Sequence, residues 1–127
     1  MSEPTFLTLA EVIVLHERSL ARYGGSSGLR DAGGFEAAVE QPKNTFYYGA
    51  GDLFDVAAAD AFHIAQAQAC LDGNKRTGVA AALVFLRFNG VAAIYDQWKI
   101  HEHMIAIAER RSGKVELAGF LRAVARP

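Results

Sequence analysis

The chain has 127 residues, of which 51% are hydrophobic and 21% charged, which is typical of one folded domain and excludes a disordered chain. The formal net charge of −1 excludes a general attraction to nucleic acid or to an anionic membrane, so any affinity for anions must be local. The longest apolar run, residues 79–86, is far shorter than the ~20 residues that cross a bilayer. A single cysteine and an N-terminus without signal-peptide character favour the cytoplasm. We expect residues 1–127 to form one cytoplasmic domain with no membrane or direct nucleic-acid partner.

The first half of the chain predicts two helices of unequal length. Thr8 and Glu11 have the spacing of a capping box, and apolar residues then recur at helical spacing, which predicts a helix over residues 9–22. A short second helix is predicted over residues 34–41, because Pro42 disfavours its continuation. The aromatic and glycine-containing segment 43–51 is interpreted as an exposed loop or small hairpin.

The second half predicts a pair of central helices. Asp52 is a good cap for a helix from residue 53 to about residue 70, and another runs from about residue 74 to Asn89. Both are apolar over most of their circumference and are joined by the tight turn 71–73, so we expect an antiparallel hairpin. Residues 91–96 are ambiguous, and helices follow near 98–110 and 115–125. The sum is a compact all-α domain with little or no sheet.

The tip of this hairpin carries Asp72-Gly73-Asn74-Lys75-Arg76-Thr77. Lys75 and Arg76 fall in the first turn of a helix, where free N–H groups attract anions and where the helix dipole opposes cations. Two cations there are more reasonable if they hold a phosphate, and Asp72 is a suitable ligand for Mg²⁺ beside it. The alternative is an ordinary turn with a helix cap and two solvated cations.

These residues resemble the second half of the Fic/Doc signature, His-x-Phe-x-(Asp/Asn)-(Ala/Gly)-Asn-(Lys/Arg)-Arg. Residues 26–31, 35–38 and 80–90 also resemble the Doc (death-on-curing) branch, and the similarity extends from about Phe6 to Arg122. The resemblance implies a small helical domain. Fic proteins transfer AMP or another phosphate-containing group to a protein hydroxyl, whereas Doc proteins transfer a phosphoryl group, with elongation factor Tu as the known type of target.

Carried over by position, the resemblance implies ATP or another nucleoside triphosphate and Mg²⁺ as cofactors. Asp72 would ligate the metal ion and Gly73 would let backbone amides approach the phosphates. Asn74, Lys75 and Arg76, followed by Thr77, would bind and polarise the nucleotide.

The resemblance also implies protein partners. Phe46, Tyr47 and Tyr48 lie where the family's flap docks its target, and are either that docking surface or anchors in the core. If the protein is a toxin, a separate antitoxin would restrain it.

The signature departs at its first position, where Gln68 replaces the histidine that acts as general base, and Cys70 replaces the phenylalanine. Glutamine cannot take a proton near neutral pH, and general base help is worth ~10²–10⁴-fold in rate. Gln68 can still orient a hydroxyl or hold a phosphate. The chain is therefore either an active transferase or a pseudoenzyme that binds nucleotide or a partner without transfer.

No other residue is a clear substitute for this base. His16 and His63 are expected to be hydrogen-bonded interior histidines, and His101 and His103 to belong to a solvated face. Cys70 is expected to be buried, and the carboxylates of the helix before the loop, Asp55 and Asp60, to be surface or N-terminal helix charges.

Overall fold

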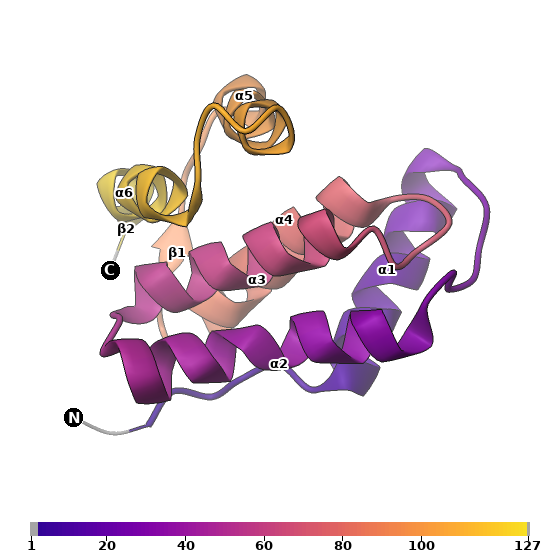
Figure 1. Cartoon of the computed structure of the whole chain (residues 1–127). Coiled ribbons are helices and arrows are strands. Elements are labelled where there is room, and N and C mark those ends of the chain that lie inside the picture. The colour runs from indigo at the N-terminus through magenta and orange to yellow at the C-terminus, as the bar shows by residue number, and fades with distance from the viewer. Residues whose placement is uncertain (1–2, 127) are drawn as a thin grey trace.

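The computed structural model describes residues 3–126, and Figure 1 shows that helices dominate it. The helices are α1 Leu9–Tyr23, α2 Ala32–Gly49, α3 Leu53–Ala67, α4 Asn74–Phe88, α5 Gln97–Ala108 and α6 Lys114–Val124. Two short strands, β1 Ala92–Ala93 and β2 Ala125–Arg126, form an antiparallel pair. The prediction of an all-α domain is confirmed. Within the described residues, no helix is both long enough and apolar enough to span a bilayer.

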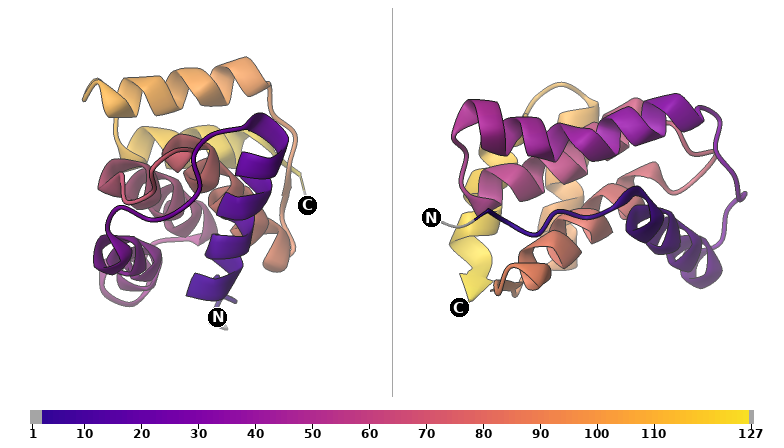
Figure 2. Two further views of the ribbon diagram at one scale, coloured as in Figure 1. Left: turned by 90° about the vertical axis from the view of Figure 1, so that its right-hand side faces the viewer. Right: turned by 90° about the horizontal axis from the view of Figure 1, so that it is seen from below.

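Helix α3 is the centre of the core, with α2, α4 and α6 packed around it (Figures 1 and 2). Its buried face is rich in alanine, which lets neighbouring helices approach closely. One such close approach is at Gly78 of α4, where a Cβ atom would lie 2.7 Å from the carbonyl oxygen of Ala61. Only glycine fits this crossing without a shift of one helix, so Gly78 fixes the depth of α4 against α3.

Helix α1 packs across α4 on the side of the molecule away from α6. Its predicted capping box is confirmed, because the Thr8 hydroxyl accepts from the N–H of Glu11 and the Glu11 carboxylate accepts from the N–H of Thr8. Helix α5 stands above α4 and leaves a space between α5, α4 and α1 that is described below (Figure 2).

The predicted stop at Pro42 is wrong, since α2 continues through it to Gly49, and the predicted loop at 43–51 is helical over most of its length. Pro42 lacks an N–H and costs a helix interior about 3 kcal/mol. Burial of Phe35, Val39 and Pro42 itself against the core offsets that cost. Tertiary packing has therefore overridden the local preference.

The predicted end of the third helix near residue 70 is also wrong, because α3 ends at Ala67. The carbonyl oxygen of Ala69 accepts from the N–H groups of Arg30 and Asp31, and the N–H of Leu71 donates to the carbonyl oxygen of Gly28. These bonds include an antiparallel bridge between Leu29 and Cys70, which takes the place of further helix after α3. The segment between α1 and α2 thus shapes the loop between α3 and α4.

Candidate functional site

The loop between α3 and α4 is closed by one side chain. The amide of Asn74 accepts from the N–H of Cys70 and donates to its carbonyl oxygen, both at 3.0 Å. Gly73, with φ +78°, supplies the left-handed turn that joins the loop to α4. Asn74 was predicted to bind phosphate, and in this structure its side-chain amide uses two of its four possible hydrogen bonds to maintain the loop.

Asp72 is held from two sides by α1 and the segment that follows it. Its carboxylate Oδ2 accepts from the N–H of Ser26 at 2.7 Å, and its backbone carbonyl oxygen lies 2.8 Å from Nε2 of His16. Because a carbonyl oxygen only accepts, Nε2 of His16 carries the proton. His16 is buried, as predicted, and its bond fixes the loop. Asp72 keeps its other carboxylate oxygen without a partner among the described residues.

The start of α4 has no side-chain cap, because its N-cap residue is Gly73. Helices α1, α2, α3 and α5 all have a threonine or aspartate oxygen in that position. The N–H groups of residues 74–76 have no acceptor in the part of the chain that the structure describes. Lys75 is exposed and makes no ion pair with a described residue. The arrangement can receive an anion, since free amides, the helix dipole and a cation meet there.

Arg76, unlike Lys75, is bound to other groups of the protein. Its Nη2 donates to the carbonyl oxygen of Gly24 at 3.1 Å, and its Cζ lies 5.3 Å from the centre of the Tyr23 ring. Both groups belong to the C-terminal end of α1, which is the negative end of that helix. The cation at the start of α4 is therefore partly compensated within the protein, so a bound anion is not needed to explain it. Its Nε is buried and has no partner among the described residues.

Two further residues, Cys70 of the loop and Thr77 in the first turn of α4, are fully buried. Cys70 is fully buried, as predicted, and Leu71 is 44% exposed, so Leu71 does not fill the space of the missing aromatic side chain. Thr77 is fully buried, and its N–H donates to the carbonyl oxygen of Gly73. In this conformation Thr77 offers no group to a ligand, although it was predicted to bind nucleotide.

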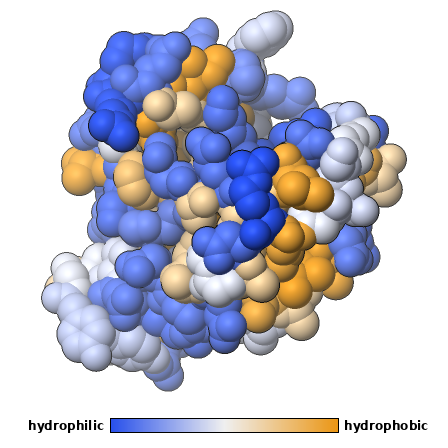
Figure 3. All heavy atoms as spheres, turned by 45° about the vertical axis from the view of Figure 1, so that its right-hand side comes forward, coloured by the Kyte–Doolittle hydropathy of each residue, from blue (hydrophilic) through white to orange (hydrophobic). Residues whose placement is uncertain are grey.

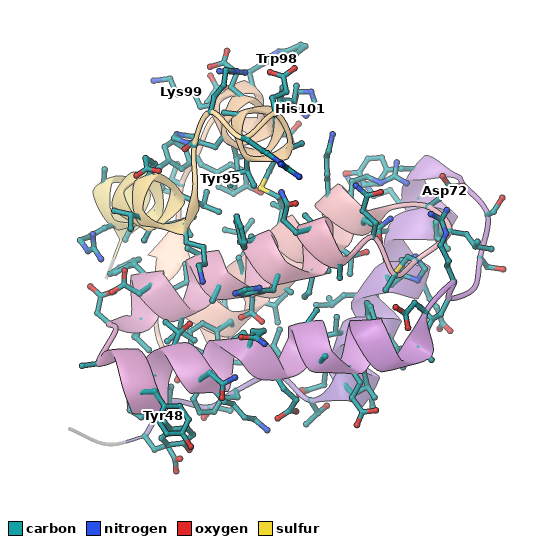
Figure 4. All side chains as sticks on the ribbon, in the orientation of Figure 1. Tyr48, Asp72, Tyr95, Trp98, Lys99 and His101 are labelled. Carbon is teal, nitrogen blue, oxygen red and sulfur yellow. The ribbon has the colours of Figure 1, made fainter. Side chains whose placement is uncertain are left out.

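A groove of about 840 Å³ opens beside the start of α4, between α1, α4 and α5. Apolar residues form much of its lining, and Trp98 and His101 contribute from α5 (Figures 3 and 4). No carboxylate lines it among the described residues. The cations that do are Arg18, Arg22, Lys75, Arg76 and Arg87. The groove is therefore a basic and partly apolar surface that includes two residues of the predicted nucleotide site.

Gln68, the residue in place of the expected base, is exposed and follows the last residue of α3. It has a left-handed backbone conformation, with φ 46° and ψ 38°. Histidine is among the non-glycine residues enriched in this conformation. The position can therefore accept the histidine of the family signature without rearrangement of the backbone.

The other candidate bases are histidines of α3 and α5, outside the loop between α3 and α4. His63 is half-buried, and its Nε2 lies 3.1 Å from Nζ of Lys114. Burial and the positive charge of Lys114 lower the pKa of His63 to about 4, so it is neutral at pH 7. His103 packs on Phe120, and His101 is on the exposed side of α5.

The interpretation of Asp60 as a surface or helix-end charge is wrong. Asp60 is 2% exposed in the middle of α3, and its Oδ2 has no hydrogen-bond partner among the described residues. Burial raises the pKa of Asp60 well above 3.8, which favours the protonated form. Asp55 does lie in the first turn of α3, as predicted.

The three aromatic residues proposed for target docking lie far from the loop. The start of α2 is bonded to Ala69, and its other end, with Tyr48, lies about 26 Å away at 1.5 Å per residue (Figure 4). Phe46 packs against the core and against Phe6, whereas Tyr48 is 87% exposed. Phe46 is thus an anchor, and an exposed docking surface at this end would belong to Tyr47 and Tyr48.

Comparison with known proteins agrees with this fold and motif. The model of the Fic/DOC family matches residues 6–86. The chain is 34% identical over 113 residues to the "Protein kinase doc" of Escherichia phage P1, covering 88% of this chain and 89% of the relative. It is 42% identical over 118 residues to the "Toxin Doc" of Mycolicibacterium smegmatis (strain ATCC 700084 / mc(2)155), covering 87% of this chain and 90% of the relative. The protein belongs to the Fic/DOC family.

The contribution of α1 was not predicted from the sequence. Arg18 and Arg22 both line the groove. Their spacing of four residues indicates that they share one face of α1. Nothing in the sequence indicates that His16, Tyr23 and Ser26 contact the loop, because they are about 50 residues away from it.

Proposed function

We propose that this protein is a Doc-type toxin that transfers a phosphoryl group from a nucleoside triphosphate to a hydroxyl group of a target protein. The observation that carries the proposal is the start of α4, where uncapped amides and Lys75 lie beside Asp72 and Arg76. Phosphoryl transfer depends mainly on positioning and on stabilisation of charge, which such groups supply. The similarity to a relative named as a protein kinase favours phosphoryl over AMP transfer.

Asp72 is the residue proposed to hold Mg²⁺, through its carboxylate. Among the described residues, no group of three or more histidine, cysteine or acidic side chains is arranged to hold a metal ion. This fits a Mg²⁺ site of the kind completed by the phosphates of a nucleotide and by water. The metal ion would neutralise charge on the phosphates, while Lys75 and Arg76 hold their oxygens.

Gln68 supports a second candidate, a pseudoenzyme that binds nucleotide or a protein without transfer. Its amide has no basic group to take the proton of the target hydroxyl. In the first candidate that proton passes to solvent, the γ-phosphoryl group forms a bond to the hydroxyl oxygen, and the nucleoside diphosphate leaves. Transfer then proceeds more slowly than with a histidine at position 68.

The groove is the proposed site of an antitoxin. Along α4 it extends from Lys75 to Arg87, about 18 Å at 1.5 Å per residue, which matches about three turns of a partner helix. Its apolar lining and five cations suit a helix with apolar residues on one face and acidic residues at its margins. Such a partner would cover Lys75 and Arg76 directly. For the target we retain elongation factor Tu as the proposed type of protein.

The test is incubation of the purified protein with γ-labelled or α-labelled ATP and elongation factor Tu or cell lysate. Transfer of the γ-label supports a kinase, and transfer of the α-label supports AMP transfer. We expect Gln68→His to increase the rate by ~10²–10⁴-fold. If the unaltered protein transfers neither label while Gln68→His does, the pseudoenzyme is correct. If neither protein binds ATP in a titration, the transferase is wrong and so is a pseudoenzyme that binds nucleotide.

A further inference from the structure

The end of α1 brings two cations onto one aromatic ring. The Cζ atoms of Arg76 and Arg22 lie 5.3 and 5.4 Å from the centre of the Tyr23 ring, within range of cation–π attraction. Tyr23 is the last residue of α1 and is 57% exposed, so its ring is not part of the hydrophobic core. All three residues line the groove.

The guanidinium of Arg76 is restrained at two points, both contributed by this end of α1. Helix α1 stops at Gly24, whose φ of +83° turns the chain away and leaves its carbonyl oxygen to accept from Nη2 of Arg76. The Tyr23 ring provides the second restraint. No carboxylate lines the groove among the described residues, so the guanidinium of Arg76 is not neutralised there by an ion pair. An arginine fixed in advance loses less conformational entropy when it binds a ligand.

We propose that Tyr23 is a positioning residue that holds the Arg76 guanidinium in the orientation in which it meets phosphate. The proposal rests on the proposed function for its nucleotide part. The hydroxyl group of Tyr23 has no role in it, since the contact is made by the ring. The effect of Tyr23 on binding is therefore transmitted only through Arg76.

A first experiment measures the order of Arg76 without any ligand. In an NMR spectrum of the arginine Nε–H groups, assigned with Arg76→Lys, the signal of Arg76 is expected to be shifted by the ring current of Tyr23. Tyr23→Phe should keep the shift and Tyr23→Leu should remove it. An unchanged Arg76 signal in Tyr23→Leu overturns the proposal whether or not the protein binds nucleotide.

A second experiment measures ATP affinity with Mg²⁺ in a double-mutant cycle. Tyr23→Leu should weaken binding about 2- to 5-fold, which corresponds to an exposed cation–π contact, and Tyr23→Phe should bind like the unaltered protein. In the Arg76→Ala background, Tyr23→Leu should change nothing further. An equal loss in both backgrounds overturns the proposal, because Tyr23 would then contact the nucleotide itself. If the unaltered protein binds no ATP, the proposed function fails, and the role of Tyr23 in binding fails with it.

Discussion

The starts of α3 and α4 lie at opposite ends of the central hairpin, and they differ in the cap residue and in the charges around it. At the start of α3, the carboxylate of Asp52 accepts from the N–H groups of Phe54 and Asp55, and Arg122 of α6 binds the same carboxylate through Nε and Nη2. At the start of α4, the cap is a glycine and the neighbouring charges are cations. The N–H groups at the start of α3 have a side-chain acceptor in the protein, whereas the N–H groups at the start of α4 remain available as donors.

The pKa of Asp52 reflects the hydrogen bonds that its carboxylate accepts. Partial burial raises the pKa of Asp52, but hydrogen bonds from the N–H of Asp55 and from Arg122 outweigh it, so the net pKa is below 3.8. A charge that is stabilised in this way contributes to folding. A cation such as Lys75, without a partner among the described residues, contributes little to folding and is free to bind a ligand. The charges around Asp52 thus stabilise the fold, whereas those at the start of α4 belong to the proposed ligand site.

Removal of one arginine from each cluster should distinguish the two helix starts most strongly. We expect Arg76→Ala to weaken ATP affinity by about 10- to 100-fold, since a hydrogen bond to a charged group is worth about 1.5–3 kcal/mol. Arg122→Ala should leave that affinity unchanged and lower the free energy of unfolding by about 1 kcal/mol or less, because its ion pair is half-exposed. Titration with ATP and urea unfolding of both variants provide the measurements. Equal ATP affinities of the two variants would contradict the assignment of the site.

Gly78→Ala is expected to displace the start of α4 from α3. The added Cβ would meet the Ala61 carbonyl oxygen at 2.7 Å, and overpacking of this kind costs about 1–3 kcal/mol. Urea unfolding measures the loss. Gly119→Ala in α6 is the matched control, because nothing lies within 4 Å of its added Cβ, and it should stabilise the protein by about 0.5–1 kcal/mol. A stable Gly78→Ala variant would mean that the α3–α4 crossing is looser than described.

Asp52→Ala gives α3 an uncapped start like that of α4. Loss of the cap and of the Arg122 contact should lower the free energy of unfolding by about 1–2 kcal/mol. Asp52→Asn separates the two contributions, because an asparagine still caps the helix but lacks the charge. Thermal unfolding compares both with the unaltered protein. If Asp52→Ala is as stable as the unaltered chain, the cap has no structural value here.

Asp60→Asn tests the buried carboxyl group of α3, whose Oδ2 has no hydrogen-bond partner among the described residues. The pKa of Asp60 is raised in the folded state, so the folded state binds more protons than the unfolded state above pH 3.8. The carboxyl group therefore makes the protein less stable as pH rises from 3.8 through its folded pKa. Asp60→Asn should remove this decline, and its advantage in unfolding free energy should grow with pH and then level off. If the difference in unfolding free energy between the variant and the unaltered protein is constant with pH, the titration of Asp60 does not cause the decline.

Three features could be predicted from the amino-acid sequence alone: the helical class, the capped starts at Thr8 and Asp52, and the loop motif from Asp72 to Arg76. These features depend on periodicity, capping chemistry and residue type, which act over a few neighbouring positions. The sequence failed at Pro42 and at the end of α3, where distant contacts outweigh local preference. The contacts of His16 and Tyr23 of α1, and of Ser26 in the segment after it, with residues 72–76 depend on the tertiary structure, as does the burial of Asp60. Such contacts join residues about 50 positions apart, and no local pattern encodes them.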